Sequence, residues 1–413
     1  MRPNDLALAA LTAALAAAAL LAPRDAHAAA CNAILTADGG SNPIVYVGGS
    51  SASQPFVQAI AQALALDTKP VTIVYHALGS CVGVDGVLTQ TSRMGSGALG
   101  TPSSQAIYWD GAGVQQTCDL PQDGSSNYPL IDIGVSDVFA SACVPLPNGL
   151  PSNVVDFLGP IQTMTFIVPA GSQQTAISAR AAYFVFGFGD QSGVAPWTDP
   201  TLMWRRNGSS GTQAMVAQAI GVDKAKWKGL DAGGAGKVLA NVGASTTKPD
   251  ATIGILAATD IPADNTTLKI LPYRHYDQTC SYYPDSTASS HDKQNVRDGH
   301  YAIWGPLHFL IDTSRANQAD SRRVVNYLVG NTPPPGGIDL ISLEAKKNVV
   351  PSCAMHVKRN SEVGPLQSFA PPNACSCYFD SVVGKTPSCK ACKGDQDCSS
   401  GAPKCSFGYC ETQ

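Results

Sequence analysis

Three short loops carry residue types that can hold an anion. They lie at residues 49–53, 78–81 and 206–212, and each presents serines and glycines immediately before a segment with helical spacing. Small residues let the backbone curl around an anion, while free amides and the positive end of a helix dipole attract it without formal charge. A single loop of this kind is more often an ordinary helix cap. The interpretation as a binding site therefore requires that the three loops converge.

Four segments carry a family pattern, at residues 49–55, 75–83, 132–137 and 205–212. In this order they resemble the phosphate-binding periplasmic proteins of phosphate ABC importers (PstS-like proteins), and the resemblance spans about residues 44–350. Residues 132–137 match the family's Asp-Phe-Gly-Ala-Ser-Asp motif, and residues 205–212 match its Arg-Arg-x-x-x-Ser-Gly-Thr motif. The resemblance implies an α/β protein with the two-lobed, type II periplasmic-binding-protein fold. It also implies that phosphate or a related oxyanion binds between the lobes.

The resemblance further implies which residues contact the ligand. The implied set is Ser53, Ser80, Asp137, Arg206, Ser210, Gly211 and Thr212. Arg206 can direct two donors at two oxygens, and the hydroxyls and the Gly211 amide can donate to the others. Asp137 can only accept a hydrogen bond when ionised, so it favours a protonated anion such as hydrogen phosphate over sulfate.

The chain departs from the family pattern at three places. Gln54 replaces the usual aromatic residue of the first loop, and Gly208 stands where the family carries an acidic residue two positions after the binding arginine. An insertion at about residues 92–128, polar, glycine-rich and without periodicity, predicts an inserted loop that Cys118 anchors. This loop either reshapes the cleft or lies harmlessly on the surface.

A catalytic interpretation is weaker than a binding one. Residues 79–83 superficially resemble a nucleophile elbow with Cys81 in the nucleophile position, but no histidine can be assigned as its base. We therefore expect a protein that is not an enzyme and that carries no cofactor and no metal. Two alternatives stay open: a secreted phosphate-ester hydrolase, and a surface adhesion or matrix protein that has lost ligand binding.

Composition and the first residues indicate an exported protein. An apolar run at residues 6–21 is followed by Ala26-His27-Ala28, which is the pattern of a cleaved signal peptide. Lipid anchoring at Cys31 is a less favoured alternative. The formal net charge of −4 excludes a basic nucleic-acid-binding surface, so local donors must hold any anion. We expect a secreted, periplasmic or cell-surface protein whose partner is an ABC transporter permease or a membrane sensor.

The order of strands and helices must position the three loops. Strands are predicted at residues 44–48, 71–75, 131–135, 164–168, 251–257 and 301–311, and residues 202–204 lead into Arg205 and a polar turn. Helices are predicted at residues 56–64, 177–186, 212–220, 315–328 and 338–347, with Pro55 in the first turn of the first helix. Strand, loop, helix and strand at residues 44–75 form the kind of unit that builds parallel sheets, so a layered α/β protein is predicted.

The cysteines divide the chain further. All thirteen lie beyond the signal peptide, which predicts disulfides and one unpaired or shared thiol. Seven of them crowd the C-terminal end, from Cys375 to Cys410. The predicted organisation is a signal peptide at residues 1–28, a two-lobed domain at 29–372 and a cysteine-rich tail at 373–413. A zinc site in the tail, at Cys389-x-x-Cys392, is the less favoured alternative to disulfides.

Overall fold

A mixed sheet of eleven strands runs through the computed structural model, in which residues 28–34, 40, 42–96, 105–121 and 128–412 are described. Its hydrogen-bonded order is β4-β3-β2-β1-β5-β13-β6-β10-β8-β9, and β11 also pairs with β6. The strands are β1 (Ile44–Gly49), β2 (Thr72–His76), β3 (Gln105–Trp109), β4 (Gln115–Asp119), β5 (Ile133–Ser136), β6 (Val154–Pro169), β8 (Met203–Arg205), β9 (Leu230–Asp231), β10 (Ile253–Ala257), β11 (Leu268–Leu271) and β13 (Trp304–Asp312). The predicted signal peptide lies outside the described residues except for Ala28.

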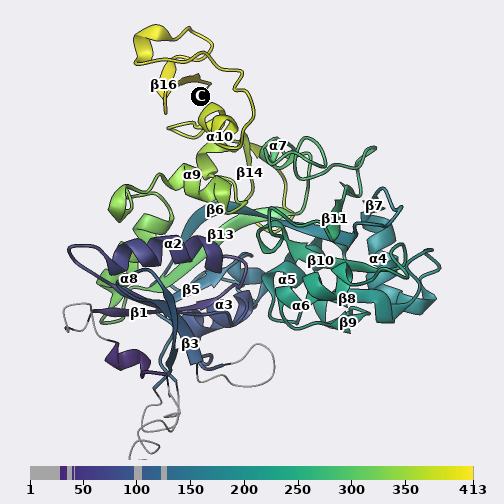
Figure 1. The fold of residues 1–413 in the computed structure, drawn as a ribbon, viewed down its shortest axis with the longest axis horizontal. Coiled ribbons are helices and arrows are strands. Elements are labelled where there is room, and N and C mark those ends of the chain that lie inside the picture. The colour runs from purple at the N-terminus through teal and green to yellow at the C-terminus, as the bar shows by residue number, and fades with distance from the viewer. Residues whose placement is uncertain (1–27, 35–39, 41, 97–104, 122–127, 413) are drawn as a thin grey trace, which may run out of the picture.

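The sheet divides into two lobes that share strand β6 (Figure 1). Residues 154–163 of β6 pair with β13, and residues 164–169 pair with β10 and β11. Lobe one holds β1–β5 and β13, with helices α2 (Gln54–Ala65), α3 (Ser80–Leu88) and α8 (Gln318–Leu328). Lobe two holds β8–β11, with α4 (Ala179–Phe188), α5 (Gly211–Ile220) and α6 (Ala235–Gly243). The prediction of an α/β protein with two lobes is confirmed.

The direction of the strands brings the predicted loops to one edge of each lobe. In lobe one, β1 is parallel to both β2 and β5, so the loops that follow all three strands leave the sheet at the same edge. In lobe two, β8 is parallel to β10, so the loops that follow these strands are neighbours as well. Ligands of open α/β sheets bind beyond the carboxyl ends of parallel strands. The topology therefore places all three predicted loops where a ligand site is expected.

Each lobe has its own hydrophobic core. Helix α2 buries Phe56, Val57, Ile60, Ala61 and Leu64 against the sheet of lobe one, as its spacing predicts. The core of lobe two includes Phe166, Phe186, Trp227 and Ile255. Complete burial of a side chain such as Phe56 stabilises the fold by about 1.5–3 kcal/mol. The site loops are thus held by hydrophobic cores in both lobes, and the core of lobe two extends to Ala52 and Val138 of lobe one.

The predicted inserted loop is partly wrong. Residues 105–119 form a hairpin, β3–β4, that extends the sheet of lobe one beside β2. Trp109 and Ala106 are buried there, and this burial stabilises a segment whose polar composition hid its alternation. Cys118 does anchor the segment, through a disulfide to Cys31. The remaining parts of the prediction at residues 97–104 and 122–127 lie outside the described residues.

Strand β6 is much longer than the predicted strand at residues 164–168. It contains 16 residues, and its first part includes Gly159 and Pro160, which interrupt any strand pattern in the sequence. Pairing with β13 holds this part extended, with an irregularity in register between Pro306 and His308. Neighbouring backbone, rather than local propensity, decides the length of this strand.

The C-terminal region packs against both lobes and is rich in disulfides. Its elements are α9 (Leu340–Lys346), β14 (Val357–Lys358), β15 (Gln367–Ser368), α10 (Ser376–Val382), β16 (Lys404–Ser406) and β17 (Tyr409–Glu411). Helix α7 (Gln294–Arg297), from the segment before β13, is linked to α10 by the ion pair of Arg297 with Asp380. Four disulfides lie in this region: Cys353–Cys375, Cys377–Cys389, Cys392–Cys405 and Cys398–Cys410. Two others lie in lobe one: Cys31–Cys118 and Cys81–Cys143. Cys280 is exposed and unpaired. Every tail cysteine lies in a disulfide, so the prediction of disulfides rather than zinc ligands is confirmed.

Two further short strands, β7 (Ile177–Ser178) and β12 (Tyr273–Arg274), pair with each other at the start of α4. In the part of the chain that the structure describes, no helix combines the length and the apolar character that a membrane span requires.

Candidate functional site

Asp137 lies at the centre of the loops that lobe one contributes. Its Oδ1 accepts a hydrogen bond from Ser50 Oγ at 2.5 Å, and its Oδ2 accepts one from Ser80 Oγ at 3.1 Å. Ser50 follows β1, Ser80 begins α3 after β2, and Asp137 follows β5. Three loops from three strands therefore meet at one carboxylate, as the parallel arrangement predicts.

Close backbone packing makes this meeting possible. Gly49 has a φ of +141°, and a Cβ placed on it would lie 2.0 Å from the carbonyl oxygen of Val135. The Ser50 amide donates to that same carbonyl at 2.9 Å, and the Gly79 amide donates to the Gly49 carbonyl at 2.7 Å. Only glycine fits where the first loop crosses the end of β5.

The carboxyl group of Asp137 has an unusual environment. Burial raises its pKa above the ordinary value, and the hydrogen bonds from Ser50 and Ser80, together with the positive charge of Arg206, oppose that shift. Its side chain is only slightly accessible, since the residue is 3% exposed. A buried acceptor of this kind is suited to a ligand that brings its own proton.

Lobe two contributes Arg206, which follows β8. One of its terminal nitrogens, Nη2, donates to Ser51 Oγ of lobe one at 3.1 Å, so this contact joins the two lobes. The other, Nη1, pairs with Asp260 Oδ2 at 3.4 Å. The guanidinium is almost fully buried, and its Nε has no hydrogen-bond partner within the described part of the chain.

Asp260 is a site residue that sequence reasoning missed. It follows β10, which lies beside β8. Its carboxylate therefore reaches Arg206 from a different segment of the chain, whereas residue 208 lies in the same loop as Arg206. Burial raises the pKa of Asp260 to about 6, Asp137 adds to this rise, and Arg206 opposes it. An acidic residue next to the binding arginine is therefore present, although Gly208 occupies the position where the family pattern has it. Its place at the carboxyl end of a predicted strand was the available signal.

The start of α5 touches lobe one directly. A Cβ placed on Gly211 would lie 2.3 Å from Ser80 Oγ and 2.7 Å from Asp137 Oδ2. The Cys81 amide also donates across the lobes to the Ser209 carbonyl at 3.0 Å. The two lobes are thus in contact at the site, and Gly211 is the residue that permits this contact.

Two polar groups at the start of α5 are buried without partners. Thr212 Oγ1 and Gln213 Nε2 make no hydrogen bond within the described residues. Gln213 Oε1 accepts from the Arg206 amide at 3.1 Å, which fixes the side chain beside the arginine. Buried donors without partners are rare in proteins and call for an explanation such as a ligand.

The predicted residues are therefore gathered in one region, with differences in detail. Ser80, Asp137 and Gly211 are in contact, and Arg206 lies against the first loop through Ser51. Ser53 belongs to the same loop, but its hydroxyl lies 3.0 Å from the Tyr75 hydroxyl and bonds to the Ser50 carbonyl. The Ser210 hydroxyl caps α5 by accepting from the Gln213 amide.

The serines that sequence reasoning missed are Ser50 and Ser51, which make the contacts to Asp137 and Arg206. The serine-rich loop was recognised as a whole, but which hydroxyl turns toward the other lobe depends on how the loop folds.

A second layer behind Asp137 comes from the C-terminal region. The Phe139 amide donates to Glu362 Oε1 at 2.9 Å, while Glu362 Oε2 has no partner among the described residues. Burial raises the pKa of Glu362 to about 7, and Asp137 adds to the rise. The guanidinium of Arg359 lies 3.9 Å from the centre of the Trp304 ring. The chain after α9 therefore supports the loop that carries Asp137.

Comparison with known proteins yields similarity of structure alone. No protein-family model matches the chain, and no curated protein matches it. A structure from Clostridium perfringens, of a candidate phosphate ABC transporter substrate-binding protein with bound phosphate, is 12% identical, with a TM-score of 0.48, and covers 75% of this chain and 99% of its own.

Two further solved structures show weaker likeness. An ABC-type phosphate transport receptor from Vibrio cholerae is also 12% identical, with a TM-score of 0.46, and covers 74% of this chain and 99% of its own. The OxyR regulatory domain from Pseudomonas aeruginosa is 8% identical, with a TM-score of 0.37, and covers 70% of this chain and 98% of its own. Because these TM-scores lie below 0.5, the function proposed next rests on the geometry of the site.

Proposed function

We propose that this chain is an extracytoplasmic solute-binding protein that captures phosphate or a related oxyanion between its two lobes. The observation that carries the proposal is the meeting of opposite lobes around complementary groups. Asp137 of lobe one offers an acceptor, while Arg206, Thr212 and Gln213 of lobe two offer buried donor atoms that have no partner in the described chain. An oxyanion with one proton can satisfy both sides at once.

The free energies involved favour a ligand. A buried donor without a partner costs about 1–3 kcal/mol, so an anion that accepts from three of them recovers a substantial part of this cost. Asp137 excludes anions without a proton, because two acceptors facing each other repel. Asp260 limits the field of Arg206, so the site relies on directed hydrogen bonds more than on net charge.

Loading requires the lobes to separate. The contacts between Gly211 and Ser80, and between Arg206 and Ser51, close the route to Asp137 in this structure. Strand β6 runs through both lobes, and the point between Thr163 and Met164 forms the natural hinge. Closure around an anion would then present a different surface to a membrane partner, either an ABC transporter permease or a sensor.

Location outside the cytoplasm is supported by the disulfides. Six are present among the described residues, and disulfides persist mainly in oxidising compartments. Together with the predicted signal peptide, they favour a periplasmic, secreted or cell-surface protein.

Calorimetry with phosphate, arsenate and sulfate tests the proposal. We expect phosphate and arsenate to bind and sulfate to bind much more weakly, and we expect Asp137→Asn to reduce that discrimination by about tenfold, or about 1.4 kcal/mol. Mass spectrometry of anions released from the native protein identifies the natural ligand. If none of the three anions binds and Asp137→Asn behaves as the native protein does, the chain has lost ligand binding and the adhesion or matrix alternative is favoured.

A second candidate function, ester hydrolysis, is favoured by a cluster outside the cleft. Ser376 Oγ lies 3.0 Å from His356 Nε2, and His356 Nδ1 lies 2.6 Å from Asp298 Oδ1. Hydroxyl, imidazole and carboxylate in this order can activate a serine nucleophile. However, the Cys377 amide, which would polarise a substrate carbonyl beside Ser376, already donates to Glu411 Oε1 at 2.7 Å. The chain's own carboxylate thus occupies that donor.

A fluorophosphonate probe separates the two functions. If Ser376 is a nucleophile, the probe labels the native protein and releases fluoride, and Ser376→Ala abolishes the labelling. If the native protein is not labelled, the cluster is a structural hydrogen-bond network and hydrolysis at Ser376 is ruled out.

A further inference from the structure

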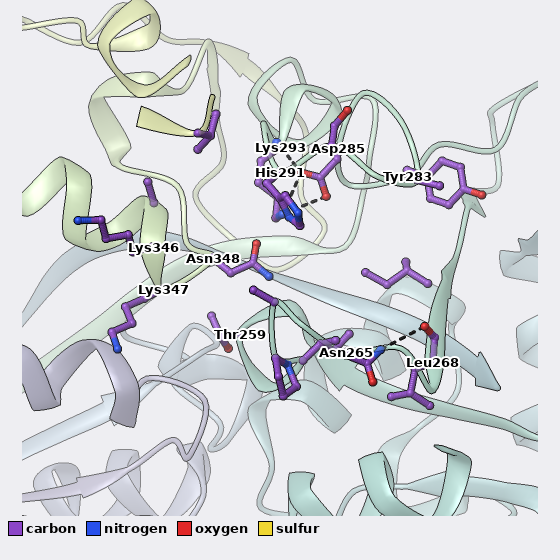
Figure 2. Close-up of a pocket in the computed structure, with 18 of the residues that line it drawn as sticks. Thr259, Asn265, Leu268, Tyr283, Asp285, His291, Lys293, Lys346, Lys347 and Asn348 are labelled. Carbon is purple, nitrogen blue, oxygen red and sulfur yellow. Dashed lines mark hydrogen bonds and ion pairs between the residues drawn. The ribbon is translucent and has the colours of Figure 1, made fainter. Parts of the chain in front are cut away.

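A cavity lies between the lobes and the C-terminal region (Figure 2). Its volume is about 660 Å³. Five segments of the chain form its walls: the start of α2 at Pro55, residues 259–270 of lobe two, the loop at residues 283–293, the end of α9 and the end of α10. We call it the tail cavity, because α10 closes one side of it.

Ion pairs hold the walls of the tail cavity in place. The Lys293 ammonium lies 2.9 Å from both carboxylate oxygens of Asp285, and both residues are buried. Lys385, just after α10, pairs with Asp292 at 3.2 Å, so the loop at residues 283–293 is joined to the tail. Arg297 and Asp380 form a second such link at 2.5 Å. The cavity is therefore a built feature rather than a gap between loosely packed segments.

The lining combines apolar surface with positive charge. Ile261, Leu268, Ile270 and Tyr283 contribute apolar surface on one side, and Val382 and Val383 of α10 contribute it on another. Lysines contribute the charge: Lys269, Lys346 and Lys347 line the cavity in addition to Lys293.

Negative charge in the lining is already neutralised. Among the described residues that line the cavity, Asp285 is the single carboxylate, and Lys293 is its partner. No ion pair within the described residues involves Lys346 or Lys347. In a chain with a net charge of −4, this cavity is a local region of positive potential.

We propose that the tail cavity binds a small organic anion, with an apolar body and a carboxylate, phosphate or sulfonate group. Cavities of about 300–1,000 Å³ with mostly apolar walls and a few convergent polar groups are typical of small-molecule sites. The apolar body contacts the isoleucine, leucine and valine side chains, and the charged group lies near Lys346 and Lys347. This site is separate from the cleft and does not depend on the function proposed for it.

The placement of the cavity gives the cysteine-rich tail a role. Helix α10 is attached to the body by the disulfide between Cys353 and Cys375 and by the ion pairs of Asp380 and Lys385. Without α10 the cavity would lose the wall that Val382 and Val383 form. The tail then serves to complete a binding site.

Fluorescence titration of the full chain with 1-anilinonaphthalene-8-sulfonate tests the proposal, since this dye joins an apolar body to a sulfonate. We expect saturable binding to the native protein. The variant Lys346→Glu/Lys347→Glu should raise the dissociation constant about tenfold or more, because two attractive charges become repulsive. The matched control Lys226→Glu/Lys237→Glu makes the same change of charge on exposed lysines that do not line the cavity, and it should bind the dye as the native protein does.

Two further measurements test whether the cavity stays intact in the variants and whether the dye binds at a site separate from that of phosphate. The uncharged analogue N-phenyl-1-naphthylamine should bind both lysine variants about equally, which shows that the cavity is intact. Inorganic phosphate should not displace the dye. The proposal is overturned if Lys346→Glu/Lys347→Glu binds the dye as tightly as the native protein, if the control variant loses binding to the same extent, or if phosphate displaces the dye.

Discussion

The two anion sites that we propose, the cleft and the tail cavity, are built in opposite ways. In the cleft, a single guanidinium faces Asp137 and Asp260, and attraction comes from hydroxyls and the start of α5. In the tail cavity, Lys346 and Lys347, which form no ion pair within the described part of the chain, lie beside apolar walls. Directed hydrogen bonds in a closed site favour one shape and one protonation state, whereas net charge beside apolar surface favours a class of molecules. The comparison predicts high selectivity in the cleft and broad tolerance in the cavity.

The largest expected effect follows from removing the charge at the centre of the cleft. Arg206→Met should abolish measurable phosphate binding and lower the free energy of unfolding by about 1.4 kcal/mol at pH 7, because Asp260 loses its partner and, with a native pKa of about 6, takes up a proton rather than staying charged. Urea denaturation measures this loss. Dye binding in the tail cavity should stay within about twofold of the native value, since Arg206 does not line it.

The loss of stability in Arg206→Met should depend on pH, in a direction that follows from the pKa of Asp260. The pKa of Asp260 is already raised to about 6, and loss of Arg206 raises it further. Below about pH 6 the Asp260 carboxyl is neutral in both folded proteins, so the loss is absent there and grows as the pH rises above 6. Arg205→Met is a matched control, because Arg205 makes a more exposed ion pair with Asp231. An equal loss in both variants would contradict the role of Asp260.

The next effect tests whether closure of the lobes matters in the cleft. Gly211→Ala places a Cβ against Ser80 and Asp137, so we expect the lobes to stay apart and phosphate affinity to fall by about tenfold, or about 1.4 kcal/mol. Small-angle X-ray scattering measures the expected opening. Gly208→Ala is the control in the same loop, because a Cβ there meets nothing within 4 Å. If both variants bind phosphate equally, the contact at Gly211 does not control access.

A smaller effect tests whether Asp260 weakens the attraction of the Arg206 guanidinium for the oxyanion. As the pH rises through about 6, Asp260 ionises and competes with the oxyanion for the guanidinium. Asp260→Asn should therefore bind phosphate several times more tightly than the native protein at pH 7.5 and about equally at pH 5. The ratio between the two proteins at each pH, measured by calorimetry, cancels the titration of phosphate itself. A ratio that does not change with pH would remove Asp260 from the site.

The smallest expected effect is a difference between the two sites in how strongly salt weakens ligand binding. The screening length falls from about 10 Å at 0.1 M to about 3 Å at 1 M salt, and exposed charges are affected most. Dye binding in the tail cavity should weaken about fivefold over this range, whereas phosphate binding in the buried cleft should weaken about twofold or less. The uncharged dye analogue corrects for effects of salt on apolar binding. Equal salt dependence in both sites would erase the proposed difference between them.

Much of the cleft could be predicted because its parts are local in sequence. The loop at residues 49–53 lies between a buried strand and a helix whose apolar spacing is regular, and the same holds for the segment that ends in α5. Glycine and serine have strong local preferences for such turns. For these reasons the loops and the helices that follow them were found at nearly the observed residues.

The parts that could not be predicted depend on neighbours in space. Asp260 comes from a segment more than fifty residues beyond Arg206, and no local pattern shows that β10 lies beside β8. The same is true of Ser51, whose hydroxyl meets Arg206 only because the lobes touch. The β3–β4 hairpin was hidden by its polar composition, and burial of Trp109 against lobe one decides its structure.

By itself, the sequence determined the class of fold, the presence of disulfides and the three loops that meet near Asp137 and Arg206, which we propose hold an anion. These follow from periodicity, turn chemistry and residue type, which act over a few positions. Only the tertiary structure decided which hydroxyls face the cleft, which carboxylate pairs with Arg206, which twelve of the thirteen cysteines form disulfides, and that the tail closes a cavity. Such contacts join segments far apart in the chain, and packing of whole elements, rather than any local preference, sets their geometry.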